Sequence, residues 1–391
     1  MRIDVSPKLL AWARERAGLD KDALLKAFPK LMDWEKGEVQ PTLKQLEHFA
    51  NKTHQPIGVF FLPDPPEVIL PIPDFRTMAA TPYRQPSPDL LDTIYLCQQR
   101  QEWYRDFARI HSHEQLGFIG SKRLADSVTQ TAKEINDTLN FSFEQRQQAG
   151  TWTDALRMFV EQVEKTGILV MASGVVGSNN YRKLEPEEFR GFALADNLAP
   201  LIFINANETI SAKIFTLAHE LAHLWLGESG VSNLLMQQMP ARGQRAGGPD
   251  KETEQWCNRV AAELLVPMAD LAGVYNKEND LNTEMERLAR RYKVSTLVVL
   301  RRIFDMKAIA AETFWNTWNE EFERLINIER RSGAGGDFYR TLGVRISKRF
   351  AAALVTSTLE GQTLFRDAFR MLGIKKSATF YEIAAQFGFR K

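Results

Sequence analysis

The sequence predicts an α+β fold that is mostly helical, with one small sheet. Apolar residues recur at helical spacing over most of the chain, and from residue 280 onward they do so throughout. Only three short runs have the character of strands, residues 167–171, 189–194 and 200–204. Of the 391 residues, 44% are hydrophobic and 25% are charged, which is ordinary for folded globular domains. A chain of this length is expected to form about two or three domains.

The composition excludes several classes of protein. A strongly basic nucleic-acid-binding protein is not indicated, because 50 Lys and Arg residues stand against 49 Asp and Glu residues. The two cysteines, Cys97 and Cys257, are too few for a disulfide framework, so we expect a reducing, cytoplasmic location. No apolar run reaches the roughly 18–20 residues needed to span a bilayer, and no membrane partner is expected.

Residues 1–62 are predicted to form a small module of short helices. Ser6 followed by Pro7 is typical of a helix start, and Gly18 is typical of a helix end. Thr42 and Gln45 have the spacing of a capping box at the start of a later helix. Several short helices within about 60 residues have the size of a helix-turn-helix module.

Residues 63–86 are predicted to be an extended connector. Seven of the 17 prolines of the chain lie in this stretch, and prolines at this density prevent helix formation. The stretch also contains the apolar run Val68–Leu70, so we expect it to lie as a strap on a neighbouring domain. The next helix is expected to begin at Ser87 and Pro88.

Residues 87–275 contain all the predicted strands and the two strongest helical patterns. The first of these helices begins near Ser211 and ends at Gly227, and the second spans residues 252–265. Residues 228–250, between the two helices, are rich in glycine and are predicted to form a loop, and long loops of this kind are more often functional than idle. Residues 276–391 are predicted to form a C-terminal helical domain.

The first of the two helices contains the pattern H-E-x-x-H, from His219 to His223. Residues four apart lie on one face of a helix, so both imidazoles can bind the same ion. Glu220 lies on the adjoining face, where its carboxylate can take a proton from a metal-bound water without binding the metal itself. The pattern therefore indicates a zinc site with Glu220 as the general base.

A catalytic zinc site of this kind needs a third protein ligand. No histidine follows His223, so we expect a carboxylate from the second helix. Glu254 is preferred over Glu252, which lies nearer the fraying end of that helix, and Glu263 is expected to be a salt-bridge or supporting residue. Cys257 is a further soft ligand to consider, and a small buried packing residue is the simpler interpretation of it.

The two helices resemble those of the ImmA/IrrE family of zinc metallopeptidases. The resemblance rests on the run Phe215–His223 and on Glu254–Pro267, which is similar to the family pattern E-x-x-A-N-x-F-A-A-x-L-L-x-P. It implies that the first Glu of this pattern, here Glu254, is the third zinc ligand. Cys257 and Val260 depart from the pattern, which usually has a small residue and Phe at these positions. The resemblance covers roughly residues 130–270 and implies a zincin-like domain.

The N-terminal module resembles the XRE-type helix-turn-helix that is often fused to these peptidases. It departs from the usual pattern because Glu35 follows Gly18 at an interval of only 17 positions, which shortens the turn and the recognition helix. Residues 1–63 carry ten Lys or Arg and eight Asp or Glu, a weak positive charge for binding phosphates. A protein-docking or autoregulatory role is therefore favoured over DNA binding through residues 1–62.

The resemblance implies a site-specific endopeptidase that cuts a regulatory protein, such as a helix-turn-helix repressor, in a stress-response, mobile-element or toxin–antitoxin setting. The substrate peptide is expected to lie antiparallel to an exposed edge of the 189–194 strand. Arg190 and Tyr181 are candidate substrate-binding residues. Together with Arg182 they are also the candidate donors to the oxyanion of the reaction. The alternative is a DNA-binding regulator or antitoxin-like protein that uses the peptidase fold as a sensor or partner-binding platform.

Overall fold

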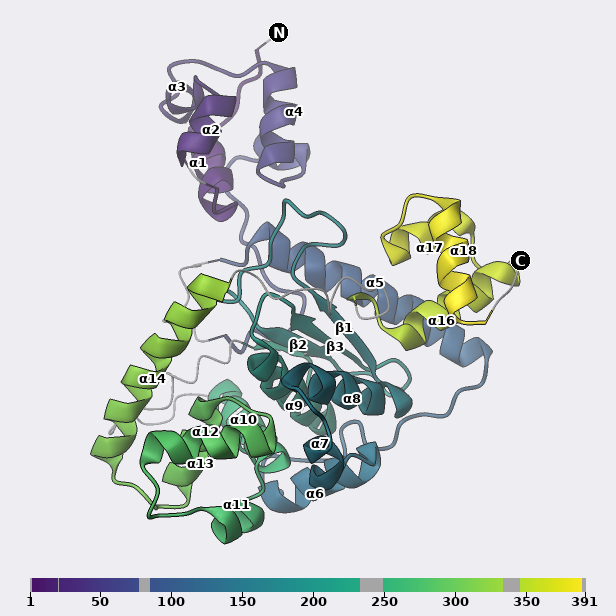
Figure 1. Cartoon of the computed structure of the whole chain (residues 1–391). Coiled ribbons are helices and arrows are strands. Elements are labelled where there is room, and N and C mark those ends of the chain that lie inside the picture. The colour runs from purple at the N-terminus through teal and green to yellow at the C-terminus, as the bar shows by residue number, and fades with distance from the viewer. Residues whose placement is uncertain (1, 20, 77–84, 233–248, 333–344, 389–391) are drawn as a thin grey trace. The chain divides into compact units, whose positions relative to one another are not determined.

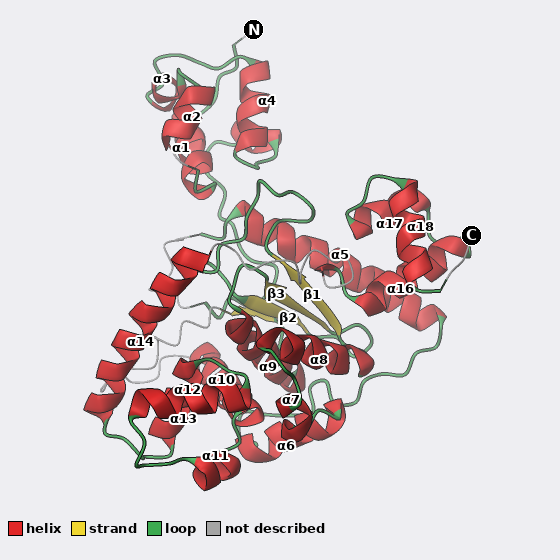
Figure 2. Ribbon diagram, viewed as in Figure 1, coloured by secondary structure: helices red, strands yellow, loops and turns green. Residues whose placement is uncertain are grey.

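The computed structural model describes residues 2–19, 21–76, 85–232, 249–332 and 345–388 (Figure 1). The chain divides into two compact units, one formed by Met1–Pro71 and Met78–Tyr95 and the other by Ile72–Thr77 and Leu96–Lys391. Most described elements are helices, and one four-stranded sheet lies in the second unit (Figure 2). The predicted mostly helical α+β class is confirmed. None of the described helices is both long enough and apolar enough to cross a lipid bilayer.

The first unit contains the short helices predicted for residues 1–62. They are α1 (Pro7–Arg16), α2 (Lys21–Ala27), α3 (Leu31–Glu35), α4 (Leu43–Lys52) and the 3-10 helix η1 (Ile57–Phe61). Pro7 takes the first position of α1, and Thr42 and Gln45 form the predicted capping box at the start of α4. The apolar faces of these helices share one core, to which Trp34 and Phe49 contribute their rings.

The sheet of the second unit has the strand order β1-β3-β2-β4. Its strands are β1 (Leu169–Ser173), β2 (Gly191–Leu194), β3 (Leu201–Asn205) and β4 (Gly230–Ser232). β1 is parallel to β3, whereas β2 is antiparallel to both β3 and β4. All residues of these strands are buried, which explains why the sequence shows continuous apolar runs instead of alternation.

Two predictions about this sheet are wrong. Residues 230–232 lie within the predicted loop 228–250 but form β4, a strand too short for a sequence pattern to indicate. The 189–194 strand has no exposed edge, because β2 lies between β3 and β4. Residues 233–248, which make up most of that predicted loop, lie outside the described residues.

The helices of the second unit pack on the sheet and on one another. They are α5 (Pro88–Ile110, which begins in the first unit), α6 (Val128–Leu139), α7 (Phe143–Gln147), α8 (Trp152–Lys165), α9 (Ile210–Leu226), α10 (Pro249–Leu265), α11 (Met268–Val274), α12 (Leu281–Tyr292), α13 (Thr296–Asp305), α14 (Ala311–Ser332), α16 (Lys348–Leu359), α17 (Phe365–Leu372) and α18 (Ser377–Gln386). α9 contacts β2, β3, α8 and α10. Every residue of α9 from Lys213 to Trp225 is buried, so this helix lies in the interior of the unit.

Two buried arginines hold the carboxyl end of α10. Arg146 of α7 donates to the carbonyl of Leu265, and Arg302 of α13 donates to the carbonyl of Val266 at 3.0 Å. The last carbonyls of a helix lack partners within the helix and carry partial negative charge, so a guanidinium group is a favourable partner for them. Arg302 also pairs with Glu263, in agreement with the predicted salt-bridge role of that residue.

A buried carboxyl group connects α8 to the C-terminal helices. Glu164 is 8% exposed and accepts a hydrogen bond from Ser347, the residue that caps α16. Burial raises the pKa of Glu164 to about 7, although hydrogen bonds from Ser347 and from the backbone act in the opposite direction. The folded state therefore favours the neutral carboxyl group, and this preference makes stability depend on pH.

We expect Glu164→Gln to raise thermal stability at pH 8 and to change it little at pH 5. The stabilising preference of the fold for neutral Glu164 is fully present below about pH 4.5 and is lost as the pH rises toward 7. Gln keeps the hydrogen-bond acceptor without the charge, so the difference between the two pH values should be about 2–3 kcal/mol. Thermal unfolding at both pH values measures it. Glu161→Gln, which removes a partly exposed carboxylate one turn earlier on α8, is the control and should show no such dependence.

Candidate metal centre

α9 places two imidazoles side by side. His219 and His223 lie one helical turn apart, and both side chains are fully buried. Their Nε2 atoms are 3.0 Å apart. Thr209 caps the start of α9, and Gly227 ends the helix in the left-handed conformation, as predicted. The local sequence thus fixes the helix on which both histidines are presented.

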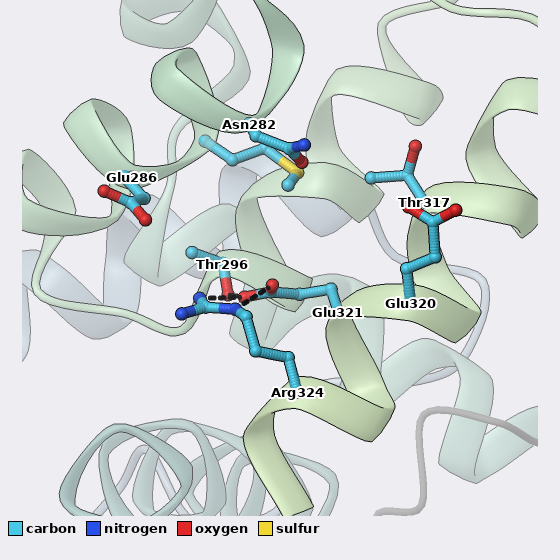
Figure 3. A pocket seen from close by; sticks show the side chains of 8 residues that line it. Asn282, Glu286, Thr296, Thr317, Glu320, Glu321 and Arg324 are labelled. Carbon is cyan, nitrogen blue, oxygen red and sulfur yellow. Dashed lines mark hydrogen bonds and ion pairs between the residues drawn. The ribbon is translucent and has the colours of Figure 1, made fainter. Parts of the chain in front are cut away.

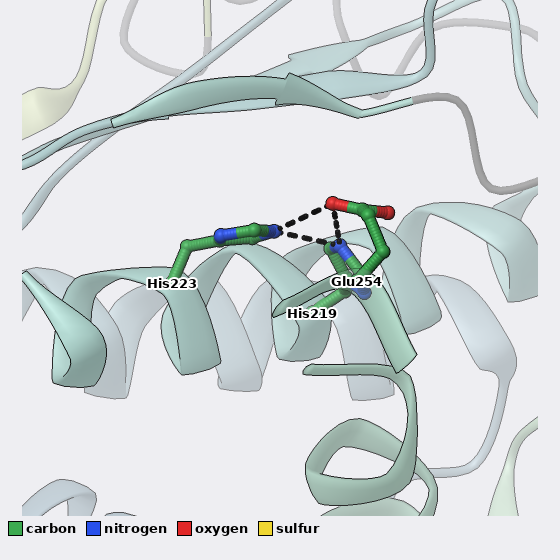
Figure 4. A group of neighbouring side chains, drawn as sticks. All are labelled: His219, His223 and Glu254. Carbon is green, nitrogen blue, oxygen red and sulfur yellow. Dashed lines mark hydrogen bonds and ion pairs between the residues drawn. The ribbon is translucent and has the colours of Figure 1, made fainter. Parts of the chain in front are cut away.

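α10 brings Glu254 to the same point. Glu254 Oε1 lies 3.0 Å from His223 Nε2 and 3.4 Å from His219 Nε2. Figure 4 shows the two imidazoles and the carboxylate turned toward one another. These three residues are the one group of potential metal ligands that converges within the described part of the chain.

The other candidates for a third ligand lie elsewhere. Glu252 is exposed, and Glu263 pairs with Arg302 at the far end of α10. Cys257 is buried in the core between the helices, and burial raises the pKa of its thiol well above the usual range. The Cys257 thiol is not among the ligand atoms that converge here, so we interpret it as a packing group. Of the candidates for a third ligand, Glu254 is therefore the one that lies next to the two histidines.

Two further side chains support the cluster and were not identified from the sequence. The Nδ1 atom of His219 is 3.1 Å from Asn258 Oδ1, so Nδ1 carries the proton and Nε2 is left as the lone-pair nitrogen facing Glu254. Ser232, at the end of β4, has its hydroxyl 3.4 Å from Glu254 Oε1. The spacing of Asn258 four residues after Glu254 was a usable signal, whereas nothing in the sequence marked Ser232.

Phe75 of the connector covers His223. The two rings stack with their centroids 5.2 Å apart and an angle of 11° between their planes. The Nδ1 atom of His223 is buried and has no hydrogen-bond partner among the described groups. No sequence pattern indicated that a residue of the connector would lie at this site.

Glu220 is next to His219 on α9, but its carboxyl group is not one of the converging ligands. Neither of its buried carboxyl oxygens has a hydrogen-bond partner among the described groups. Burial and then the charge of Glu254 raise the pKa of Glu220 well above its usual range, although the nearby Ser232 hydroxyl acts in the opposite direction. A buried carboxyl group without partners reduces stability, and groups of this kind are found most often at functional sites.

The cluster fits a metal ion such as zinc. Two imidazole nitrogens and one carboxylate oxygen are a donor set typical of catalytic zinc sites. Ligand atoms about 2.0–2.1 Å from a tetrahedral zinc ion stand roughly 3.3 Å apart, close to the 3.0, 3.0 and 3.4 Å found here. Burial lowers the pKa of His219 and so favours the neutral ring that binds a metal.

The two residues predicted to bind substrate do not join this cluster. The guanidinium of Arg190 pairs with Glu208 at 3.1 Å, while its backbone N–H donates to the Ser232 carbonyl at 3.2 Å. The Tyr181 side chain is 99% exposed. Arg190 therefore lies next to the strand that carries Ser232, and Tyr181 lies at the surface.

A separate polar pocket lies among α12, α13 and α14 (Figure 3). Its most buried charge, Glu321, pairs with Arg324 at 2.6 Å and accepts a hydrogen bond from Thr296. Because this charge is already neutralised within the pocket wall, the pocket offers no set of converging free ligands comparable to the cluster on α9.

A comparison with protein families suggests a metallopeptidase-type function for the part of the chain that carries this cluster. Residues 163–304 match the family model of the IrrE N-terminal-like domain, a peptidase family, and this match contains the whole sheet together with α9 and α10. It supports the ImmA/IrrE family for this part of the chain. Residues 346–386 match a domain of unknown function (DUF8813). No curated protein shows a match to the chain.

We expect Gly191→Ala to lower the stability of the second unit by about 1–3 kcal/mol. A Cβ atom on Gly191 would lie 2.6 Å from Thr216 Cγ2 on α9 and 2.9 Å from the Phe203 carbonyl oxygen, and both contacts are too close. Thermal unfolding measures the loss. Gly273→Ala on α11 is the control, since an added Cβ there meets nothing within 4 Å. Equal unfolding midpoints for the two variants would contradict the close packing of β2 on α9.

Proposed function

We propose that this chain is a zinc-dependent, site-specific endopeptidase. The observation that carries the proposal is the arrangement around α9, where His219, His223 and Glu254 converge and Glu220 lies beside them without joining them. The match to a peptidase family supports the same activity. The resemblance of the sequence to the ImmA/IrrE family suggests the substrate, which is a regulatory protein such as a helix-turn-helix repressor in a stress-response, mobile-element or toxin–antitoxin setting.

The residues of the chain have distinct roles in this reaction. A bound zinc ion would supply a Lewis acid that polarises the peptide carbonyl and lowers the pKa of water toward about 7. Asn258 holds His219 in the tautomer that presents Nε2 to the metal. Glu220 would accept a proton on a carboxylate oxygen as water attacks the carbonyl, and would return that proton to the leaving amine nitrogen.

A purely structural zinc site is disfavoured by the donor set. Structural sites are commonly closed by four side chains and are rich in cysteine. Among the described residues three side chains converge here, and the sequence of residues 233–248 contains no His, Cys, Asp or Glu. Three protein ligands leave a position for water or substrate, as a catalytic site requires.

We expect the purified protein to bind about one zinc ion per chain, and His223→Ala and Glu254→Ala each to lose it. Metal analysis after dialysis measures the content. Glu252→Ala is the matched control, because Glu252 is an exposed carboxylate on the same helix, two residues before Glu254. Full zinc retention by Glu254→Ala would contradict the assignment of the third ligand.

The same series of variants tests the general base. Glu220→Gln should keep the zinc and the fold, because its carboxyl group stands outside the ligand set, but should lose cleavage of a repressor substrate by about 100-fold or more. Cleavage is followed by mass spectrometry of the products. If Glu220→Gln cuts at the wild-type rate, the proposed mechanism is wrong.

For residues 1–62 we propose a protein-docking or autoregulatory role. α3, in the region where the family resemblance would place a recognition helix, has five residues. Leu31 and Trp34 of α3 are buried in the core of the first unit, which leaves few positions that could reach base edges in a major groove. The alternative function, a DNA-binding regulator that uses the peptidase fold as a sensor, requires such readout.

The full chain should therefore show no sequence-specific DNA binding in the nanomolar range near physiological salt. Fluorescence anisotropy with the promoter of its own operon and with a scrambled duplex of equal length measures this. Equal, weak binding to both duplexes is expected, because the charge of the first 63 residues is close to balanced. Nanomolar affinity for the promoter alone would favour the regulator.

A further inference from the structure

The edge of the sheet nearest the metal centre is occupied by the chain itself. β4 is the last strand of the sheet, and Ser232 at its end lies against the metal-ligand cluster. Along its outer side, the Val231 N–H donates to the Pro73 carbonyl and the Phe75 N–H donates to the Val231 carbonyl, both at 3.0 Å. Residues 73–76, called the strap below, thus take the position that an added strand would take.

The direction of the strap differs from the predicted antiparallel pairing with the neighbouring strand and agrees with that prediction only relative to β2. The strap is parallel to β4, and β4 is antiparallel to β2, so the strap runs antiparallel to β2. An extended peptide was expected in this direction, next to β2. The structure places β4 there and moves the available edge outward by one strand, to the position of the strap.

Phe75 occupies a defined place beside the metal ligands. One side of its ring stacks on His223, and the ring also contacts the backbone of Gly230. A Cβ atom added to Gly230 would lie 2.1 Å from the ring, so the ring fits only because residue 230 has no side chain. We call the space between His223 and Gly230 the aromatic seat.

Arg76 anchors the end of the strap. It is 3% exposed, forms two hydrogen bonds of 2.7 Å with the carboxylate of Asp74, and lies 3.4 Å from a carboxylate oxygen of Glu188. A peptide segment that is held by paired backbone hydrogen bonds, an aromatic side chain and an arginine has the form of a bound ligand. The groups of the proposed catalytic centre, Glu220 and both histidines, are fully buried in this arrangement.

We propose that the strap holds the place of an extended peptide substrate and that Phe75 stands for an aromatic side chain of that substrate. The proposal rests on the proposed peptidase function and specifies its substrate class, a segment that pairs with β4 and places an aromatic ring in the aromatic seat. A tethered segment competes at an effective concentration of about millimolar, so substrates must displace the strap before they are cut.

The test uses a labelled peptide with the sequence of residues 70–76, Leu-Pro-Ile-Pro-Asp-Phe-Arg, and the zinc-loaded full chain. All proteins carry Glu220→Gln so that a bound peptide is not cut. Fluorescence anisotropy should show that Phe75→Ala binds the peptide about tenfold more tightly than the parent chain, because the competing ring is gone. A peptide with Ala in place of Phe should bind neither protein.

Ile69→Ala is the matched control for Phe75→Ala. It also removes a large apolar side chain from the connector, but Ile69 is 73% exposed. This variant should bind the peptide as the parent chain does. If Phe75→Ala binds the peptide no better than Ile69→Ala, or binds the Ala-containing peptide equally well, the strap does not hold a substrate's place.

Gly230→Ala provides an independent check. Its added Cβ would fill the aromatic seat, so this variant should bind neither peptide, and its own Phe75 should leave His223. Modification of His223 by diethyl pyrocarbonate, measured by mass spectrometry on metal-free protein, should be about tenfold faster in Gly230→Ala and in Phe75→Ala than in the parent chain. Unchanged modification rates in both variants would show that Phe75 does not cover the site.

These measurements separate the two proposals. Peptide binding and histidine modification do not depend on peptide-bond cleavage. If Phe75→Ala gains peptide binding while no protein substrate is cut by chains with intact Glu220, the strap assignment stands and the peptidase function fails. If substrates are cut but the strap variants behave as the parent chain, the peptidase function stands and the strap assignment fails.

Discussion

The close packing of α10 against α9 is the contact on which the metal centre depends. The two helices share a core in which Ala222, Cys257 and Ala261 are fully buried, and small side chains let helix backbones approach closely. Glu254 and Asn258 lie one turn apart on α10, so a single helix delivers both a ligand to the cluster and the group that orients His219. Apolar packing places the ligand atoms together, and the site is therefore preorganised for a metal ion.

Electrostatics distinguish Glu220 from the other buried charges of this unit. Arg302 pairs with Glu263, and Arg76 lies between Asp74 and Glu188. These pairs satisfy the requirement that a buried charge have a partner. Glu220 is different, because its carboxyl oxygens are unpaired among the described groups. A buried carboxyl group of this kind lowers stability, and it is the group for which we propose a role in proton transfer.

The connector covers part of the metal centre, because Phe75 stacks on His223. Residues 72–77 group with the second unit, whereas the residues before and after them in the sequence group with the first unit. Within the second unit the strap lies next to β4, and it belongs to the same chain as the site that it covers. A segment held in this way needs only modest contacts to occupy a site for most of the time, because its effective concentration is high. The strap makes modest contacts of this kind, namely two backbone hydrogen bonds and one stacked ring.

The sequence by itself determined the groups that lie on single helices. His219, Glu220 and His223 follow from the geometry of one helical turn, whereas Glu254 was preferred to Glu252 from its position on the next strong helix and from the family resemblance. The mostly helical class followed for the same reason, because helical periodicity is local. Only the tertiary structure decided that β4 exists, that it closes the edge of β2, and that the connector pairs with it. A three-residue strand has no periodicity of its own, and its pairing with Phe75 joins positions far apart in the chain, which local pattern cannot indicate.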